Sequence, residues 1–313
     1  MQPVSTNDPV TKGCPSPSGL DRIGAVLGDI QIAHTVFALP FALASAHLAF
    51  QLVGGYKLST LLAILVCMVT ARTGAMSFNR FLDRKLDSEN PRTGNRSIPS
   101  GRAKPLDALA VVIVCSMIFI AACWFLGPLP LILSIPTLAF LLGYSWSKRY
   151  TVLTHLWLGS ALAIAPAGAW IAIMGILTWP PVILSLAVAG WVAGFDVIYS
   201  LQDIEFDKAN RVFSVPARFG TVAALWIAKF LHLASFAFLL IFGTVMQLGW
   251  PYFAALAIAG IVLIIEHMMV RPNDFSRVGI AFFTMNGIIS ILIYIGVLLS
   301  TAPIISHVYG VGL

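Results

Sequence analysis

Charged residues are scarce in this sequence: Asp, Glu, Lys and Arg together make up 10% of its 313 residues, whereas about 25% is usual for soluble globular domains. Hydrophobic residues make up 58% of the chain, and the mean hydropathy is +0.90. So much apolar surface cannot be buried inside one soluble core, and a large part of it must face lipid. The composition therefore excludes a soluble enzyme and indicates an integral membrane protein.

Cysteine is scarce as well, and its spacing indicates no chemistry. The four cysteines, Cys14, Cys67, Cys115 and Cys123, form no CxxC pair and no metal-binding pattern, and three of them lie inside apolar runs. They are predicted to be small buried hydrophobic residues, which argues against a disulfide framework or a redox centre.

Acidic residues are fewer than basic ones, and the net charge is +6. A basic excess can indicate nucleic-acid binding, but in a membrane protein it more often records orientation. Here the basic residues gather in the N-terminal segment and in alternate loops, whereas the loops near residues 127, 176 and 248 contain no Lys or Arg. We therefore expect no nucleic-acid partner, and a chain in a bacterial inner (cytoplasmic) membrane with its N-terminus in the cytoplasm and its C-terminus outside.

Nine apolar segments are long enough to cross a membrane. They lie at about 24–48, 58–80, 106–126, 128–146, 152–174, 180–201, 220–243, 250–269 and 279–300. The chain is thus predicted to be an all-α integral membrane protein with nine transmembrane helices. Residues 1–20 are predicted to form a disordered cytoplasmic tail, and residues 21–313 a single membrane domain.

Two acidic motifs lie at the ends of the second and sixth apolar segments. The first contains Asn79, Asp83 and Asp87, and the second contains Asp196, Tyr199, Asp203 and Asp207. At the angular spacing of an α-helix, the members of each set lie within about 80° of one another on one helix face. Four predicted helices separate the two motifs, and an even number places both on the cytoplasmic side.

Carboxylates in this arrangement favour a hard cation. Oxygen ligands suit Mg²⁺, and the lack of His and Cys in both motifs argues against zinc. The alternative is that the carboxylates are solvated helix ends that balance neighbouring basic residues. Two pairs in matching positions on one side of the membrane favour a shared metal site.

Basic residues surround both motifs. They are Arg80, Arg84, Lys85, Arg92 and Arg96 near the first, Lys208, Arg211 and Arg218 near the second, and Lys148 and Arg149 between them. Carboxylates with bridging Mg²⁺ and flanking cations suit a diphosphate leaving group, because they stabilise the negative charge that develops on it. Alternatively, individual basic residues only set the orientation or contact lipid headgroups.

The run NRFLDRKLDSENPRTGNRSIPSG at 79–101 resembles the first signature of the UbiA family of intramembrane aromatic prenyltransferases. Residues 196–220 resemble the second signature, and the likeness extends through YSWSKRYT at 144–151. The resemblance implies a nine-helix bundle with a central cavity and a cytoplasmic cap. It also implies Mg²⁺-dependent transfer of an isoprenyl chain from its diphosphate to an aromatic ring.

The resemblance implies roles for single residues too. Asn79, Asp83 and Asp87 would hold one Mg²⁺, and Asp203 and Asp207 the other, while Asp196 and Tyr199 would help to orient ligands or the prenyl cation. The residues expected to bind the substrates are Arg80, Arg84, Arg96, Lys148, Arg149, Lys208 and His34. One departure from the family pattern is Arg80, which stands where many members have Asp.

Within the family, NPRTGNR at 90–96 and HTVFALPFALASA at 34–46 are similar to the quinone-pathway branch. That branch includes the 4-hydroxybenzoate polyprenyltransferases and the enzyme that prenylates dihydroxynaphthoate in the futalosine route to menaquinone. The resemblance therefore implies a prenyl diphosphate and an aromatic acid as substrates, membrane lipid as surroundings, and no obligate protein partner.

A transporter or ion carrier with acidic sites is the alternative from another class. Transporter sites usually lie near the bilayer midplane on interrupted helices. Both acidic motifs here lie at helix ends and precede Arg-rich loops, which favours diphosphate chemistry.

Further ionisable residues lie inside or beside the apolar segments, where a functional role is a fair default. Asp29 is open to three roles: contact with an acidic acceptor, ordering of the following loop, or local pairing. Arg72 lies within the second segment, and Glu266 and His267 end the eighth, where we expect them at the membrane interface. The small residues around Gly159 are expected to let helices pack closely.

Overall fold

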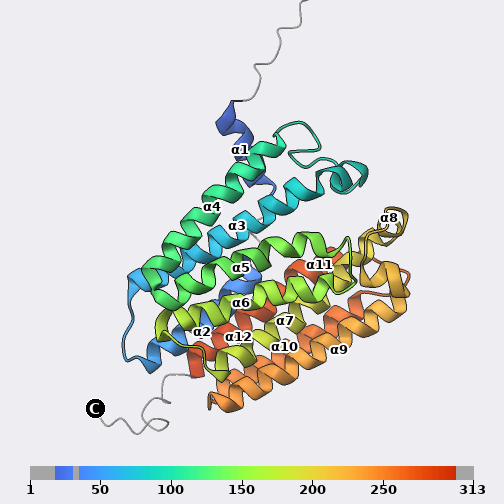
Figure 1. Ribbon diagram of the computed structural model, residues 1–313. Coiled ribbons are helices and arrows are strands. Elements are labelled where there is room, and N and C mark those ends of the chain that lie inside the picture. Colours follow the sequence, from blue (N-terminus) through green and yellow to red (C-terminus); the bar gives the residue numbers. More distant parts are fainter. Residues whose placement is uncertain (1–17, 31–34, 301–313) are drawn as a thin grey trace, which may run out of the picture.

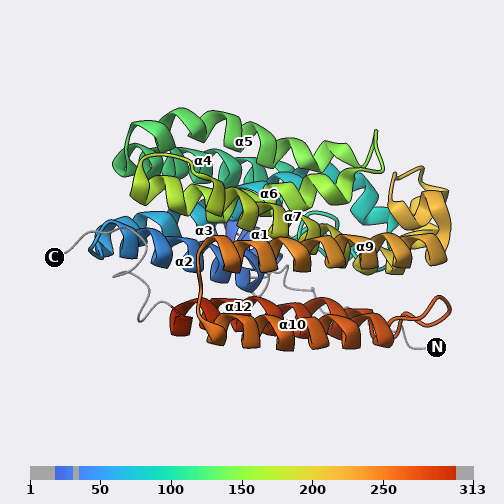
Figure 2. The same cartoon turned by 90° about the horizontal axis from the view of Figure 1, so that it is seen from below.

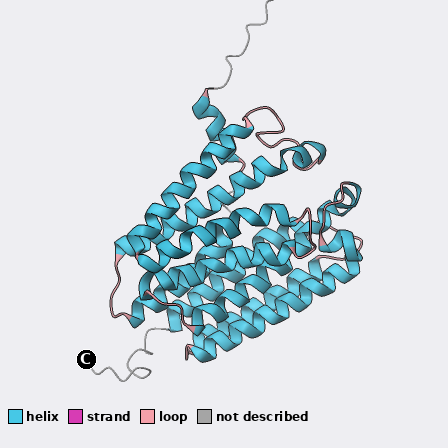
Figure 3. Ribbon diagram, in the orientation of Figure 1, coloured by secondary structure: helices cyan, strands magenta, loops and turns pink. Residues whose placement is uncertain are grey.

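The computed structural model describes residues 18–30 and 35–300, and every element named in these ranges is a helix (Figures 1 and 3). The long helices are α2 (Thr35–Leu52), α3 (Leu58–Glu89), α4 (Pro105–Leu126), α5 (Pro128–Ser147), α6 (Thr154–Met174), α7 (Trp179–Ser200), α9 (Val215–Val245), α10 (Trp250–Met269) and α12 (Asn286–Ser300). The short ones are α1 (Gly19–Gly28), η2 (Leu201–Asp203), α8 (Ile204–Ala209), α11 (Val278–Ile280) and the π-helical turn η3 (Ala281–Met285). The predicted all-α fold is confirmed.

Eight helical stretches in the described ranges are long and apolar enough to cross a membrane, and α2 adds a shorter apolar stretch, Phe37–Leu52. The nine predicted segments therefore correspond to these eight stretches and α2. The predictions for residues 1–17 and for His34 concern parts of the chain outside the described residues.

The start of the first predicted segment, 24–48, is wrong. Helix α1 is a separate element that begins with a capping box, in which Ser18 and Asp21 each bond the other's backbone N–H. It therefore takes up Gly19 and Leu20, the last residues of the predicted tail. It ends at Gly28, seven positions before α2 begins, and it buries Val26 against the start of α4. Hydropathy alone merged the two helices, because both are rich in apolar residues.

The loop between α3 and α4 is fastened to α1. Asp29 Oδ2 accepts hydrogen bonds from the backbone N and the Oγ of Ser97, at 2.7 and 2.6 Å. Nearby, Arg22 Nε of α1 donates to Asp107 Oδ2 at 3.0 Å. Three roles were considered for Asp29, and these contacts show that it orders the loop. The same loop carries the arginines that follow the first acidic motif.

Helix α7 lies at the centre of the bundle. It packs against α6 on one side and α9 on the other, while α3 packs against α4 and α5, and α2 packs against α6 and α12. Figure 2 shows α4 and α5 at one side of the bundle and α10 and α12 at the other. This arrangement leaves space between α3 to α5 on one hand and α6 and α7 on the other, where the cavity described below lies.

Aromatic side chains hold α7 in place. Trp191 and Phe195 meet edge to face, with ring centroids 5.0 Å apart at 85°. Phe37 and Phe41 of α2 contact the Trp191 ring, with centroids 6.3 and 5.2 Å away. These buried rings fix the part of α7 that leads into the second acidic motif.

Gly159 of α6 allows α6 to lie directly against α7, as its small size predicts. A Cβ at this position would come within 2.2 Å of the backbone oxygen of Ala189. We therefore expect Gly159→Ala to destabilise the protein by about 1–3 kcal/mol, the usual cost of overpacking. Thermal unfolding in detergent should show a lower midpoint.

Gly168→Ala is the matched control on the same helix, because a Cβ there meets no described atom within 4 Å. Its midpoint should stay the same or rise, since Ala favours a helix over Gly. Equal midpoints for the two variants would contradict the close contact at Gly159.

Glu266 and His267, which were expected at the membrane interface, both contact neighbouring helices, and Glu266 is buried between them. Its side chain is 0% exposed, and its Oε1 accepts a hydrogen bond from Asn286 Nδ2 of α12 at 3.1 Å. His267 pairs with His232 of α9, with 3.0 Å between Nε2 and Nδ1. Helix α10 thus presents two neighbouring polar residues to two different helices, which hydropathy along the chain cannot reveal.

Candidate active site

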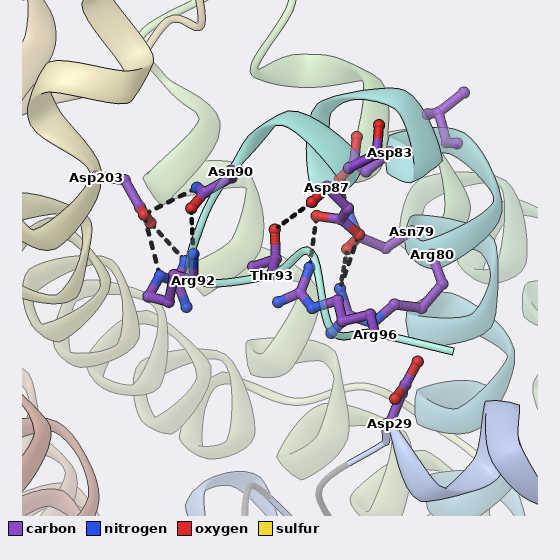
Figure 4. A network of polar contacts seen from close by, with 12 residues as sticks. Asp29, Asn79, Arg80, Asp83, Asp87, Asn90, Arg92, Thr93, Arg96 and Asp203 are labelled. Carbon is purple, nitrogen blue, oxygen red and sulfur yellow. Dashed lines mark hydrogen bonds and ion pairs between the residues drawn. The ribbon is translucent and has the colours of Figure 1, made fainter. Parts of the chain in front are cut away.

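The first acidic motif lies on the last three turns of α3, as predicted. Asn79, Asp83 and Asp87 all line one cavity, and both aspartates are buried although the helix end itself is polar. Their four-residue spacing places them one above the other on the face of α3 that looks into the cavity (Figure 4).

Asp83 is 1% exposed and is held by three donors. Lys148 Nζ lies 2.5 Å from Oδ2, and Arg149 Nη2 lies 2.9 Å from Oδ1. Asn79 Nδ2 also donates to Oδ2, at 2.7 Å. The basic pair after α5 therefore meets the first motif directly and compensates the buried carboxylate, which would otherwise be costly to desolvate.

Asp87 accepts a side-chain hydrogen bond on one of its carboxylate oxygens only. Arg96 Nη1 lies 2.7 Å from Oδ1, and Arg80 Nη1 lies 3.9 Å from Oδ2. Oδ2 is buried and accepts no hydrogen bond from any described residue. A buried carboxylate oxygen without a hydrogen bond is unusual and is suited to a ligand that the protein alone does not supply.

The second motif spans a break in the helix. Helix α7 ends at Ser200, the 3₁₀ turn η2 covers Leu201–Asp203, and α8 follows at Ile204–Ala209. The helical arithmetic that placed the four residues on one face assumed an unbroken helix, so its angles do not hold beyond Ser200. Even so, all four residues of the second motif line the same cavity as the first motif.

Arg92, in the loop that follows the first motif, binds the second motif (Figure 4). From the loop after α3, its Nε donates to Asp203 Oδ1 at 3.0 Å, and its Nη2 lies 2.5 Å from Oδ2. Its Nη1 donates to the hydroxyl of Tyr199 at 3.0 Å. Partial burial lowers the pKa of Arg92, but the hydrogen bond and the charge of Asp203 raise it further, so the pKa ends above its ordinary value.

Asp196 has a partner that the sequence did not single out. His155 Nδ1 lies 2.6 Å from Asp196 Oδ2, and His155 Nε2 accepts a hydrogen bond from the backbone N of Val215 at 3.2 Å. Since Nε2 accepts, Nδ1 carries the proton and donates to Asp196. A lone His in the apolar segment 152–174 is a functional candidate in a membrane protein, and this signal could have identified it.

The cavity has a volume of about 600 Å³ and changes character along its length. Its walls include Ile64 and Asp87, which are 23 residues apart on α3, so it extends about 34 Å along that helix. The carboxylates and arginines lie at one end, and the remainder is lined mainly by apolar side chains of α3 to α7. Near the polar end, the ring of Phe282 from η3 lies 4.2 Å from that of Tyr199, centroid to centroid.

The structure brings three of the seven predicted substrate-binding residues into the lining of this cavity. Arg80, Arg96 and Lys148 line it. Arg149 lies behind the wall and reaches the site through Asp83. Arg84 and Lys208 are not in the lining: Arg84 Nη1 donates to the carbonyl of Phe81 on its own helix, and Lys208 lies on the surface, 3.6 Å from Glu205.

Comparisons with known proteins agree with this geometry. The profile of the UbiA prenyltransferase family matches residues 38–288. The 4-hydroxybenzoate octaprenyltransferase of Nitrosomonas eutropha is 30% identical over 242 residues, which cover 74% of this chain and 81% of that protein. The enzyme of the same name from Vibrio campbellii is 27% identical over 242 residues, which cover 77% and 84%.

Solved structures have the same fold. The apo structure of a UbiA homolog from Aeropyrum pernix K1 superposes with a TM-score of 0.78 at 30% identity, over 86% of this chain and 98% of that one. A UbiA homolog from Archaeoglobus fulgidus, bound to DMAPP and Mg²⁺, superposes with a TM-score of 0.70 at 16% identity, over 89% and 98%. The second likeness concerns the fold alone.

The family match extends over most of the described chain, and the two acidic motifs meet in one cavity between the helices that the match covers. These findings decide against a transporter. The chain belongs to the UbiA prenyltransferase family and is an aromatic prenyltransferase.

Proposed function

We propose that this enzyme transfers a long isoprenyl chain from its diphosphate to a hydroxylated aromatic acid, in a Mg²⁺-dependent step of quinone biosynthesis. The observation that carries this proposal is the form of the cavity. Paired carboxylates and arginines lie at one end, and an apolar passage of about 34 Å along α3 follows. A diphosphate suits the first part, and a polyprenyl chain suits the second.

The residues present fit Mg²⁺. Among the described residues, no three His, Cys, Asp or Glu side chains converge on one point. Each proposed metal site instead offers two carboxylates, Asp83 and Asp87 in one and Asp203 and Asp207 in the other, and leaves positions for phosphate oxygens and water, the ligands that Mg²⁺ usually keeps. The buried Oδ2 of Asp87, which accepts no hydrogen bond from the described residues, is one such ligand atom.

We assign one Mg²⁺ to Asn79, Asp83 and Asp87, and the other to Asp203 and Asp207. When bound, the ions would neutralise the charge that develops on the departing diphosphate. The protein contributes further cations at the same end, since Arg80, Arg92, Arg96 and Lys148 line the cavity there.

The protein residues have three tasks in the transfer. Arginines and Lys148 hold the diphosphate while the bond between C1 and oxygen breaks and the electron pair stays on the diphosphate. The apolar walls exclude water, so that a ring carbon of the acceptor forms the new bond to C1 and then loses its proton. The rings of Phe282 and Tyr199, near the polar end, present π faces that attract an allylic cation.

Arg72 supports an acidic acceptor. It lines the cavity from α3, seven residues before Asn79, which places it about 10 Å deeper along the helix. A cation at this depth, beyond the carboxylate motifs, is suited to the carboxylate of an aromatic acid.

The proposal also covers orientation. Most basic residues outside the cavity lie in the loops at the end that holds the acidic motifs. By the positive-inside rule, we propose that this end faces the cytoplasm of a bacterial inner membrane, with the C-terminus outside.

Incubation of the purified protein with Mg²⁺ and a panel of prenyl diphosphates tests the proposed reaction. The acceptors are 4-hydroxybenzoate and 1,4-dihydroxy-6-naphthoate, and mass spectrometry identifies the products. We expect a prenylated aromatic acid from one of the two acceptors, and its mass gives the chain length. No product with either acid, or full activity in EDTA, would overturn the proposal.

Arg72→Gln tests the role of Arg72 in the same assay. We expect the KM for the aromatic acid to rise roughly ten- to a hundredfold, the effect of losing a charge-assisted hydrogen bond, while the KM for the donor changes little. Lys57→Gln is the control, because Lys57 precedes α3 at its other end and does not line the cavity. A rise in the donor KM alone would assign Arg72 to the diphosphate instead.

A further inference from the structure

A second pocket lies beside the cavity, and basic side chains dominate it. Its volume is about 500 Å³, and its walls come from the end of α3, the turn after α5 and the turn after α8. Five of its nine lining residues are basic, namely Arg84, Lys85, Lys148, Arg149 and Arg211, and no Asp or Glu belongs to the lining. We call it the basic pocket.

Three of its cations are not balanced by an acid. Lys148 and Arg149 share Asp83, which lies on the cavity side. In the described part of the chain, no ion pair joins Arg84, Lys85 or Arg211 to a carboxylate. Concentrated positive charge of this kind raises the local concentration of anions.

The pocket is a built feature and not a chance meeting of surface loops. Arg211 has φ 55°, a left-handed conformation that is uncommon outside glycine. The turn around it is held by two backbone hydrogen bonds, from Val212 N to the carbonyl of Asp207 at 2.9 Å and from Phe213 N to the carbonyl of Lys148 at 2.7 Å. The second bond ties the turn after α8 to the turn after α5, so two of the three walls are fixed to each other.

The basic pocket adjoins the cavity. Lys148 and Leu86 line both spaces, and the Lys148 ammonium points to Asp83 on the cavity side. Val212 also belongs to both linings, and Asp207 of the second motif accepts its hydrogen bond. The two spaces are therefore neighbours that share a wall formed by Leu86, Lys148 and Val212.

We propose that the basic pocket is a second binding site for phosphate-type anions, and that its occupant in turnover is the inorganic diphosphate leaving the cavity. The inference rests on the proposed function, in which the broken bond leaves its electron pair on the diphosphate. Arg84, Lys85 and Arg211, which form no ion pair in the described part of the chain, suit a small, highly charged anion. The phosphate of an anionic lipid headgroup has the same chemistry, and the experiment separates the two sources.

The test measures binding of labelled inorganic diphosphate to the purified protein in detergent. Mg²⁺ is present, and the cavity is filled with a non-reactive prenyl thiolodiphosphate. We expect the wild-type protein to bind further diphosphate under these conditions. The double variant Lys85→Gln/Arg211→Asn should bind it at least roughly tenfold more weakly, because charge-assisted hydrogen bonds are lost.

The two substitutions are chosen to preserve the fold. Lys85 and Arg211 are exposed, and Asn tolerates the left-handed conformation at position 211. Arg218→Gln is the matched control, since Arg218 is another exposed basic residue close in sequence that lines neither space. Equal affinity in the double variant and the wild type, or no binding to the filled wild-type protein, would overturn the site.

A titration with labelled thiolodiphosphate alone separates this inference from the proposed function. If the analogue does not bind but the double variant still has a lower affinity for inorganic diphosphate than the wild type, the basic pocket is supported and the proposed function is contradicted. If the analogue binds normally and the double variant binds inorganic diphosphate as tightly as the wild type, the proposed function is supported and the basic pocket is contradicted.

Nanodiscs identify the occupant. We expect the wild-type protein to bind diphosphate equally well in discs of phosphatidylcholine alone and in discs that also contain phosphatidylglycerol. We also expect diphosphate to inhibit turnover less strongly in the double variant than in the wild-type protein. If phosphatidylglycerol displaces diphosphate from the wild-type protein, the occupant is a lipid headgroup, and the assignment to the leaving diphosphate is overturned.

Discussion

Asp83→Asn and Asp203→Asn are each expected to lower the rate of prenyl transfer by a factor on the order of a thousand. Metal-assisted charge stabilisation contributes several kcal/mol, and a loss of about 4 kcal/mol corresponds to about a thousandfold in rate. Each substitution removes one carboxylate of one motif while it keeps the shape of the side chain. Initial rates with saturating donor and a series of Mg²⁺ concentrations measure the effect.

Asn is preferable to Ala because of what surrounds these carboxylates. Asp83 is 1% exposed and forms ion pairs with Lys148 and Arg149. Substitution by Ala would leave these two cations without a partner, next to an apolar gap. The amide oxygen of Asn still accepts hydrogen bonds, which helps to keep the fold. Thermal unfolding of each variant checks this point.

Asp107→Asn is the matched control for both variants. Asp107 is also an ion-paired aspartate, bound to Arg22 at 3.0 Å, and it does not line the cavity. Its activity should remain near that of the wild type. Near wild-type rates in both Asp83→Asn and Asp203→Asn would show that other groups ionise the donor.

Arg149→Lys is expected to lower kcat/KM roughly ten- to a hundredfold, which corresponds to about 1.5–3 kcal/mol. The guanidinium makes three contacts at once: Nη1 donates to the carbonyl of Ser145 at 2.9 Å, and Nη2 lies 3.2 Å from the carbonyl of Leu82 and 2.9 Å from Asp83 Oδ1. Lys keeps the charge but cannot reproduce this fork. Arg149 would thus act by orienting Asp83 and not by touching the substrate.

The Mg²⁺ dependence distinguishes this positioning role from a purely structural one. If Arg149 orients a metal-binding carboxylate, Arg149→Lys should need more Mg²⁺ for half-maximal rate, while a variant that is merely less stable should not. Arg218→Lys keeps the same chemistry at an exposed position outside both pockets and serves as control. Wild-type kinetics in Arg149→Lys and in Arg149→Ala would contradict the positioning role. Arg149 would then only help to set the orientation of the protein in the membrane.

The local features of the chain were readable from the sequence. Apolar runs of spanning length predict membrane helices, because the bilayer leaves few other structures for them. The four-residue spacing of Asn79, Asp83 and Asp87 predicts one helix face, because helical geometry relates such positions within a single element. The first motif therefore lies where it was expected, on the cavity face of α3.

Local reasoning was wrong where the backbone departs from a regular helix. The second motif crosses the 3₁₀ turn Leu201–Asp203, so the angles of a continuous helix do not apply to Asp203 and Asp207. The first predicted segment is interrupted after Gly28, although hydropathy continues on both sides. Hydropathy measures how apolar a segment is, but it does not show where the hydrogen-bond pattern of the α-helix is interrupted.

The sequence by itself determined the membrane class, the helical fold and the two acidic motifs, because each depends on residues within one helix or its ends. The tertiary structure decided which charges meet. Arg92 and Asp203 are 111 positions apart, and His155 and Asp196 are 41 positions apart. Such contacts depend on how α3, α6 and α7 pack, and that packing is set by residues outside the two motifs, such as Gly159 and Trp191. The same packing buries Glu266 and places Arg84 in the basic pocket instead of the cavity, since the face that a helix turns inward is settled only by its neighbours.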